Sequence, residues 1–179
     1  MSPFEFIAVF VAIIFGLSLT QILSGAVSLL QQRALGINQL GWTLFVLSVL
    51  VLNWWTFFPW VENSAWEVEE FFVVLVWALS HYVMASALYP SRSLEGYSFE
   101  ARRSSVLWAF IAAAFLDMAQ TAVRGGFFDP WYYSAFVSFL IGATSIGLLT
   151  RRESVHRVIP WFLVAVMVIW SVLQRRFLQ

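Results

Sequence analysis

Residues 3–32 read PFEFIAVFVAIIFGLSLTQILSGAVSLLQQ, an apolar stretch whose single charged residue is Glu5. A helix of this length rises roughly 45 Å, more than the ~30 Å hydrocarbon core of a bilayer. The stretch therefore predicts a membrane-spanning helix that tilts or projects from the bilayer. Ser2 is a good N-cap, and Pro3 suits the first helical turn. Since no basic n-region precedes the stretch and no small-residue cleavage motif follows it, we expect a retained anchor.

Five further apolar stretches follow the first one. Together they predict spans at about 3–32, 40–60, 66–89, 104–123, 130–150 and 158–173. Backbone groups in lipid must be satisfied internally, and the stretches are about twice too long for barrel strands. The composition, 61% hydrophobic and 11% charged, leaves too few polar side chains for a soluble surface. We predict an all-α fold in which residues 1–179 form one polytopic transmembrane bundle of about six spans.

Arginine placement predicts the orientation of this bundle, since every basic residue is Arg. One side of the membrane would carry Arg33, Arg92, Arg102, Arg103, Arg151, Arg152 and Arg157. The other side would carry Arg124, Arg175 and Arg176, together with the acidic loop 61–70. The positive-inside rule then places the first side in the cytoplasm and both termini outside. Arg175 and Arg176 oppose this orientation, and a re-entrant segment would remove the conflict.

Tryptophans are expected to mark the two membrane interfaces. The inner set would be Trp42, Trp108 and Trp161, and the outer set Trp60, Trp66 and Trp131.

Asp117 is the first candidate for a functional residue. It lies within the apolar stretch 112–121, roughly 10 Å below the predicted outer surface by helical rise. A carboxylate costs at least ~2–3 kcal/mol at such a depth, so it should face the bundle or a wet cavity. With Gln120 on the same face and Asn53 at a similar depth in the span at 40–60, it predicts a proton or cation site reached from outside. The alternative is a structural hydrogen bond to a neighbouring helix, through Asn53 or a tryptophan N–H.

His81 is the second candidate, at the middle of its predicted span. An imidazole there could relay protons or ligate a metal or haem. A metal site needs several ligands, and the only other histidine, His156, is expected in an inner loop. The chain has no Cys. We predict no metal and no cofactor, with a neutral His81 joining two helices; haem shared across an oligomer is the alternative.

Two spans carry seams of small or polar residues. The first seam is Ser18, Gln21, Gly25, Ser28 and Gln32, with an apolar face expected opposite at residues such as Ile22 and Leu29. The second is Ser134, Ser138, Gly142 and Ser145. Such residues let helices approach closely, so both seams predict helix packing, within the protomer or with a neighbour. The first seam could instead line an aqueous path.

Two roles are possible for the loop arginines. Arg102, Arg103, Arg151 and Arg152 are predicted to lie among lipid phosphates and to enforce topology. A phosphate-bearing ligand or a cytoplasmic partner is the alternative. Ser98 is expected to cap a short interfacial helix that runs into the span at 104–123. No phosphate-binding glycine loop, HExxH motif or basic face occurs, so nucleic acid is not an expected partner.

Phe4-Glu5-Phe6, the segment GLSLTQILSG at 16–25, Arg102-Arg103 and Leu116-Asp117 resemble stretches of small multi-pass bacterial inner-membrane proteins of uncharacterised activity. The likeness covers most of the chain with motifs of low specificity. It implies a bacterial inner-membrane location and no particular chemistry, so no residue role follows from it.

Three classes of function remain. The favoured prediction is a non-enzymatic structural or accessory subunit, in contact with lipids and with either copies of itself or other membrane subunits. The first alternative is a small homo-oligomeric cation or proton channel or transporter that uses Asp117 and the acidic outer loop. The second is a membrane enzyme or cofactor carrier that uses His81.

Overall fold

The computed structural model describes residues 2–63, 66–90, 98–125, 131–150 and 152–177, with side chains as far as Leu173. Its elements are α1 (Pro3–Gln31), α2 (Ile37–Phe57), the 3-10 helix η1 (Phe58–Glu62), α3 (Val68–Leu88), α4 (Phe99–Val123), α5 (Trp131–Leu149) and α6 (Glu153–Phe177). All six α-helices are long and apolar enough to cross a membrane. The predicted all-α, six-span bundle is therefore confirmed.

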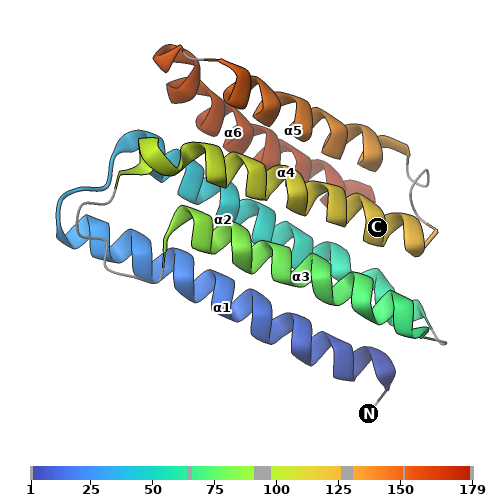
Figure 1. The fold of residues 1–179 in the computed structure, drawn as a ribbon. Helices are drawn as coiled ribbons and strands as arrows, with labels where there is room; N and C mark the ends of the chain where they lie inside the picture. The colour runs from blue at the N-terminus through green and yellow to red at the C-terminus, as the bar shows by residue number, and fades with distance from the viewer. Residues whose placement is uncertain (1, 64–65, 91–97, 126–130, 151, 178–179) are drawn as a thin grey trace.

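Consecutive helices run antiparallel to one another, and the six helices form two layers (Figure 1). One layer holds α1, α3, α4 and α5 side by side, and α2 and α6 pack together behind it. The most extensive interface joins α3 to α4, followed by those of α3 with α1 and of α2 with α6. Because consecutive helices are antiparallel, α1 begins and α6 ends at the same end of the bundle.

Two helices begin five residues earlier than the apolar pattern predicts. The predicted span at 104–123 and the expected interfacial helix before it form one continuous helix, α4, which starts directly after Ser98. Ser98 occupies the N-cap position, but its side chain makes no capping hydrogen bond. The predicted span at 158–173 starts at Glu153 and keeps Pro160 inside the helix. There Pro160 packs on Gly41 of α2, whose missing side chain brings the two helices together.

Helix capping places acidic residues at the starts of α1 and α3. Ser2 caps α1 as expected, and its hydroxyl accepts a hydrogen bond from the Glu5 backbone while the Glu5 carboxylate accepts one from the Ser2 backbone. A similar box joins Glu67 and Glu70 at the start of α3. Acidic groups are favourable at these positive helix ends. Before α5, the sequence Asp129-Pro130 predicts a cap followed by a proline in the first helical turn, but both residues lie outside the described ones.

The tryptophans do not all mark interfaces. Trp42 and Trp60 are each 1% exposed, so these two are core residues and their assignment to the inner and outer interfaces is wrong. Their large rings fill the space between helices. Trp108 and Trp131 are 62% and 71% exposed and remain compatible with an interfacial position.

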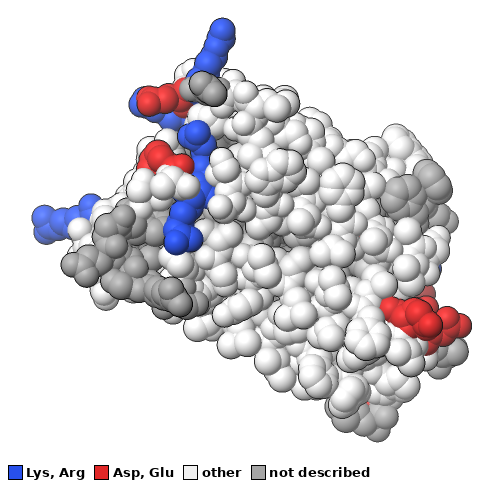
Figure 2. Space-filling model, in the orientation of Figure 1, with Lys and Arg blue, Asp and Glu red and all other residues white. Residues whose placement is uncertain are grey.

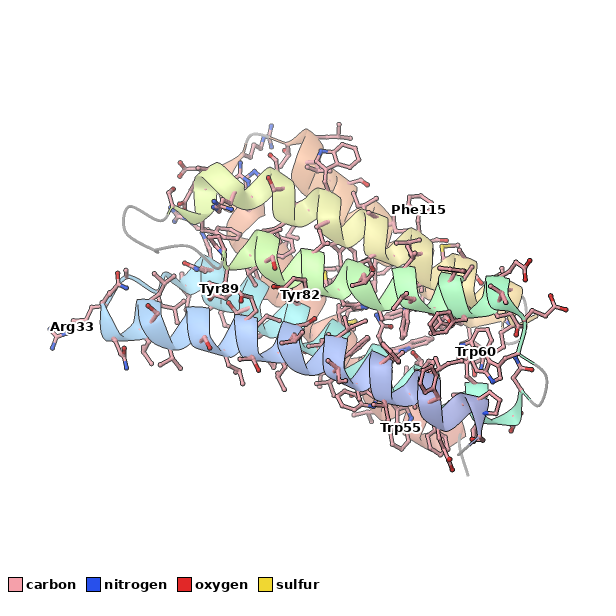
Figure 3. All side chains as sticks on the ribbon, turned by 60° about the horizontal axis from the view of Figure 1, so that its bottom comes forward. Arg33, Trp55, Trp60, Tyr82, Tyr89 and Phe115 are labelled. Atoms are coloured by element: carbon pink, nitrogen blue, oxygen red, sulfur yellow. The ribbon has the colours of Figure 1, made fainter. Side chains whose placement is uncertain are left out.

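The seam on α1 contributes to packing only in part. Ser18 and Gly25 are buried, and Gln21 donates a hydrogen bond to the backbone carbonyl of Tyr89 at the end of α3. Figure 3 shows Tyr89 beside α1. Ile22 and Leu29, expected on the opposite face, are buried as well. The buried face therefore runs between the polar seam and the apolar face, because α1 packs on both α3 and α2.

Most of the seam on α5 is not covered by another described helix of the chain. Ser134 is buried, whereas Ser138 and Gly142 are exposed and nothing lies near the position of a Gly142 side chain. The buried face of α5 is formed by Ser134, Val137, Leu140, Thr144 and Gly147. Packing of a helix of this chain on Ser138 and Gly142 is therefore not observed, and packing by a neighbouring molecule stays a prediction.

Charged side chains gather at the two ends of the bundle. On the face in Figure 2, arginines with some acidic side chains lie at the left end, and an acidic group lies at the right. We call the left end, with Arg33, Arg102, Arg103, Arg152 and Arg157, the arginine end; α2, α4 and α6 begin there. The right end, with Glu62, Glu67, Glu69 and Glu70, is the acidic end, where α1, α3 and α5 begin.

Candidate functional site

The Asp117 carboxylate is buried where α3, α4 and α5 meet, with 4% of the residue exposed. Its Oδ1 accepts a hydrogen bond from the Trp77 indole N–H at 3.0 Å and a longer one from the Gln120 amide at 3.4 Å. Its Oδ2 accepts a hydrogen bond from the Tyr133 hydroxyl. All three partners donate and an ionised carboxylate only accepts, so the site matches a carboxylate in its hydrogen-bonding character.

His81 extends this arrangement from α3 to α2. The imidazole is fully buried, with ring centroids 4.9 Å from Phe15 and 5.2 Å from Trp77. Its Nδ1 lies 2.9 Å from the Trp77 carbonyl oxygen, and its Nε2 lies 2.7 Å from Asn53 Nδ2. Since a carbonyl only accepts, Nδ1 donates and Nε2 accepts, which is the neutral tautomer.

Gln120 links Asp117 to the acidic end. Its amide oxygen accepts a hydrogen bond of 2.8 Å from the Trp60 indole of η1, and its amide nitrogen also donates to Thr121 Oγ1 at 3.1 Å. Figure 3 shows Trp60 at the acidic end of the bundle. We call the connected residues the polar cluster: Asn53, Trp60, Trp77, His81, Asp117, Gln120 and Tyr133. This cluster joins α2, η1, α3, α4 and α5.

A small cavity borders the polar cluster. It has a volume of about 40 Å³, and its polar wall is formed by Asn53, Thr56, Asp117 and Tyr133. The rest of its lining is largely apolar and comes from α2, α4, α5 and α6. A space of this size holds one or a few water molecules, with enough polar partners to keep them.

A larger cleft opens at the acidic end. It has a volume of about 450 Å³, and its lining includes Trp60, Glu62, Glu70 and Arg124. Trp60 therefore lines the cleft and also donates its indole N–H to Gln120, and Gln120 in turn donates a hydrogen bond to Asp117. Among the described residues, the hydrogen bonds of the polar cluster thus extend to Trp60, which lines the cleft at the acidic end.

The predicted site residues fall into one group. Asp117, His81, Asn53 and Gln120 all belong to the polar cluster, although Asn53 bonds to His81 rather than to Asp117. Sequence reasoning missed three members, which are Trp60, Trp77 and Tyr133. Trp77 precedes His81 by one helical turn, so the sequence spacing alone predicts that both side chains lie on the same face of the helix. No local signal distinguishes Tyr133 from Tyr132 beside it.

Metal coordination has little basis in this geometry. Within the described ranges, no three side chains of the His, Cys, Asp or Glu types converge on one point. The two ring nitrogens of His81 are already engaged by Trp77 and Asn53. The chemistry available to the cluster is hydrogen bonding and, at Asp117 and Tyr133, proton exchange.

The predicted lipid-contacting arginines lie at the arginine end. Arg102 and Arg152 are exposed and Arg103 is half-buried, whereas Arg151 is outside the described residues. Each of the three described arginines lies in or just before the first turns of α4 or α6. Their contact with lipid phosphates stays a prediction.

Six apolar helices, whose described charged side chains are either buried, as at Asp117, or gathered at the two ends, define an integral, multi-pass α-helical membrane protein. No protein-family model, curated protein or solved structure matches the chain.

Proposed function

We propose that this chain is a non-enzymatic structural or accessory subunit of a complex in the bacterial inner membrane. The observation that carries the proposal is the hydrogen bonding of the polar cluster, in which the groups placed deepest bond to one another across helices. Asp117 and His81 each have their polar atoms engaged by neighbours in the same chain. Such a cluster fixes the relative positions of helices, which is what a scaffold requires.

The orientation belongs to this proposal. The arginine end is cytoplasmic, and the N-terminus, α6's far end and the acidic cleft face the periplasm, in line with the arginine bias. Lipids cover the apolar faces, and either copies of this chain or other subunits cover part of them.

Native mass spectrometry on protein extracted in mild detergent tests the subunit proposal. We expect a defined complex whose mass exceeds that of one 20.5 kDa chain, and a partner subunit in it would support the accessory role. A chain that runs only as a monomer, across detergents that preserve known membrane complexes, would contradict it.

The second candidate function is a proton or cation site at Asp117. It is favoured by the cavity that brings Asp117, Tyr133 and Asn53 around a space of water size, and by the acidic cleft at the same end. In proteoliposomes, this function predicts ion or proton flux in the wild type that Asp117→Asn abolishes while the melting temperature changes little. Equal flux in the wild type, the variant and empty vesicles would exclude it.

A cofactor carrier based on His81 has less support, because an iron or other metal ion would have to displace the Asn53 amide from Nε2. Visible absorbance of the protein purified from its native membrane tests this alternative. A Soret band lost in His81→Gln would establish it and count against the subunit proposal.

A further inference from the structure

The Asp117 carboxylate has no counter-charge beside it in the described part of the chain. Its three hydrogen-bond partners all donate, which favours the ionised form. His81 is neutral, and no ion pair joins Asp117 to an arginine among the described residues. Arg124, the nearest arginine along the chain, lies about two helical turns further on and lines the cleft at the acidic end. Because a buried charge without a partner is costly in a membrane, a positive partner is expected beside Asp117.

The cavity beside this carboxylate has a polar wall made almost entirely of acceptors. The wall is formed by Asn53, Thr56, Asp117 and Tyr133. The Asn53 amide donates to His81 Nε2, so its Oδ1 is left without a hydrogen bond among the described residues. The hydroxyl protons of Thr56 and Tyr133 are already donated, to the Asn53 carbonyl and to Asp117. Apart from the second N–H of the Asn53 amide, the four side chains therefore offer only oxygen lone pairs to a ligand.

A wall of oxygen atoms beside a single negative charge fits a small monovalent cation. Hard cations prefer carboxylate, carbonyl and hydroxyl oxygens. One monovalent ion would neutralise Asp117, whereas a divalent ion would leave an uncompensated positive charge in apolar surroundings. The cavity volume of about 40 Å³ admits an ion of water size with at most a few waters. Such an ion needs neither histidine nor several carboxylates, so the ligand count that disfavours a transition metal does not apply to it.

We propose that this cavity binds a sodium ion. Its ligands are the Asp117 carboxylate, Asn53 Oδ1 and the hydroxyl oxygens of Thr56 and Tyr133. Sodium is favoured over potassium because the cavity is small and the larger potassium ion takes more oxygen ligands. The proposal rests on the second candidate function for a cation at Asp117, which it deepens by naming the ion, and it does not require that the ion is transported.

A sodium ion in this cavity links helices that otherwise have little contact. Asn53 and Thr56 belong to α2, Asp117 to α4 and Tyr133 to α5. Among the described helices, no extensive interface joins α2 to α4 or to α5. The ion therefore joins α2 to the other layer of the bundle, and its binding should stabilise the folded chain.

Thermal unfolding of the purified full chain in mild detergent tests the proposal. Sodium or potassium chloride replaces choline chloride stepwise at constant ionic strength. A ligand that binds only the folded state raises the melting temperature with its concentration. We expect such a rise with sodium, at lower concentrations than with potassium, and Asp117→Asn should abolish it. Thr56→Val keeps the charge and the shape but removes one ligand, so about tenfold more sodium should be needed for the same rise.

Thr144→Val is the matched control, because Thr144 also donates to a carbonyl of its own helix but does not line the cavity. Its sodium response should match that of the wild type. Equal responses of the wild type to sodium and potassium, or equal responses of Thr56→Val and Thr144→Val to sodium, would overturn the site.

Two further outcomes separate this proposal from the second candidate function. Stabilisation by lower pH without any sodium response would mean that a proton neutralises Asp117, which overturns the sodium site and leaves a proton site standing. Sodium-dependent stability of the wild type, lost in Asp117→Asn, without ion flux in proteoliposomes would support the sodium site and exclude transport.

Discussion

At the scale of single residues, Asp117 illustrates how a carboxylate is accommodated in the interior of an apolar bundle. Its donors come from α3, from its own helix and from α5, so its removal takes this acceptor from a tryptophan N–H, an amide and a phenol, and the amide keeps its bond to Thr121. Hydrogen bonds between membrane helices contribute on average about 0.6 kcal/mol each. The three bonds together therefore contribute on the order of 2 kcal/mol.

Asp117→Ala should accordingly lower the unfolding free energy by roughly 2 kcal/mol, and Asp117→Asn by less, because an amide oxygen still accepts one of the bonds. Thermal or denaturant unfolding in mild detergent measures both effects. Ser138→Ala is the control, since Ser138 is exposed on α5. If Asp117→Asn is as stable as wild type but loses ion flux, Asp117 acts as an ion site rather than as a structural link.

Glycine at position 25 is required by the Tyr89 ring. A methyl group on Gly25 would overlap this ring, whereas the same group on Gly142 would meet nothing within 4 Å. Gly25→Ala should therefore destabilise the protein by about 1–3 kcal/mol through overpacking between α1 and α3. Gly142→Ala should be neutral or slightly stabilising through helix propensity. Melting temperatures of the two variants, measured side by side, decide this prediction; equal values would contradict it.

Sequence reasoning located four polar residues of the cluster, Asn53, His81, Asp117 and Gln120, but not their pairing. The burial of Asp117 and His81 is predictable because exposing a polar side chain to lipid costs free energy, and this cost depends on the residue type alone. Pairing depends on how each helix is rotated about its axis, and this rotation is set by contacts distant in sequence. Trp60 was therefore assigned to an interface although its N–H bonds to Gln120, 60 positions away.

At the scale of helices, the positions of the spans were predictable from the sequence, whereas the buried face of each helix was harder to predict. Long apolar runs fix the number of spans, because the bilayer thickness sets their length. The buried face of α1 differs from the predicted one because α1 contacts two helices. These contacts bury a wider part of the α1 surface than the polar seam covers. On α5 the same kind of seam turns outward at Ser138 and Gly142. Small residues indicate that close approach is possible, and they do not say which helix approaches.

Self-association through α5 gives a prediction at this scale. In a chain without cysteine, Gly142→Cys should form disulfide-linked dimers in native membranes under mild oxidation, because its neighbours allow a second helix to come close. Ile13→Cys on α1 is the control, since Ile13 is 56% exposed but belongs to an apolar face. Cross-linking of both variants alike, or of neither, would contradict an α5 interface.

At the scale of the whole molecule, three arginines of the arginine end lie where they do not help the helices. Cations are favourable near helix C-termini, yet Arg102, Arg103 and Arg157 lie in the early turns of α4 and α6. Acidic residues, in contrast, lie at the starts of α1 and α3, where they cap them. The arginines thus add to a positive potential that the helix ends already create. We therefore expect the membrane to explain their placement, through topology and contact with lipid phosphates, rather than helix stability.

This charge distribution predicts the topology of the protein in the cell. Single cysteines at Glu69 and Arg102 report on the acidic and arginine ends, which lie at opposite ends of the bundle and are therefore expected on opposite sides of the membrane. In spheroplasts, a membrane-impermeant maleimide should label Glu69→Cys directly and Arg102→Cys only after the membrane is opened. The positive-inside rule acts through arginines near span ends, and five of the described arginines lie at the arginine end. The reverse labelling pattern would place the N-terminus in the cytoplasm and contradict the proposed orientation.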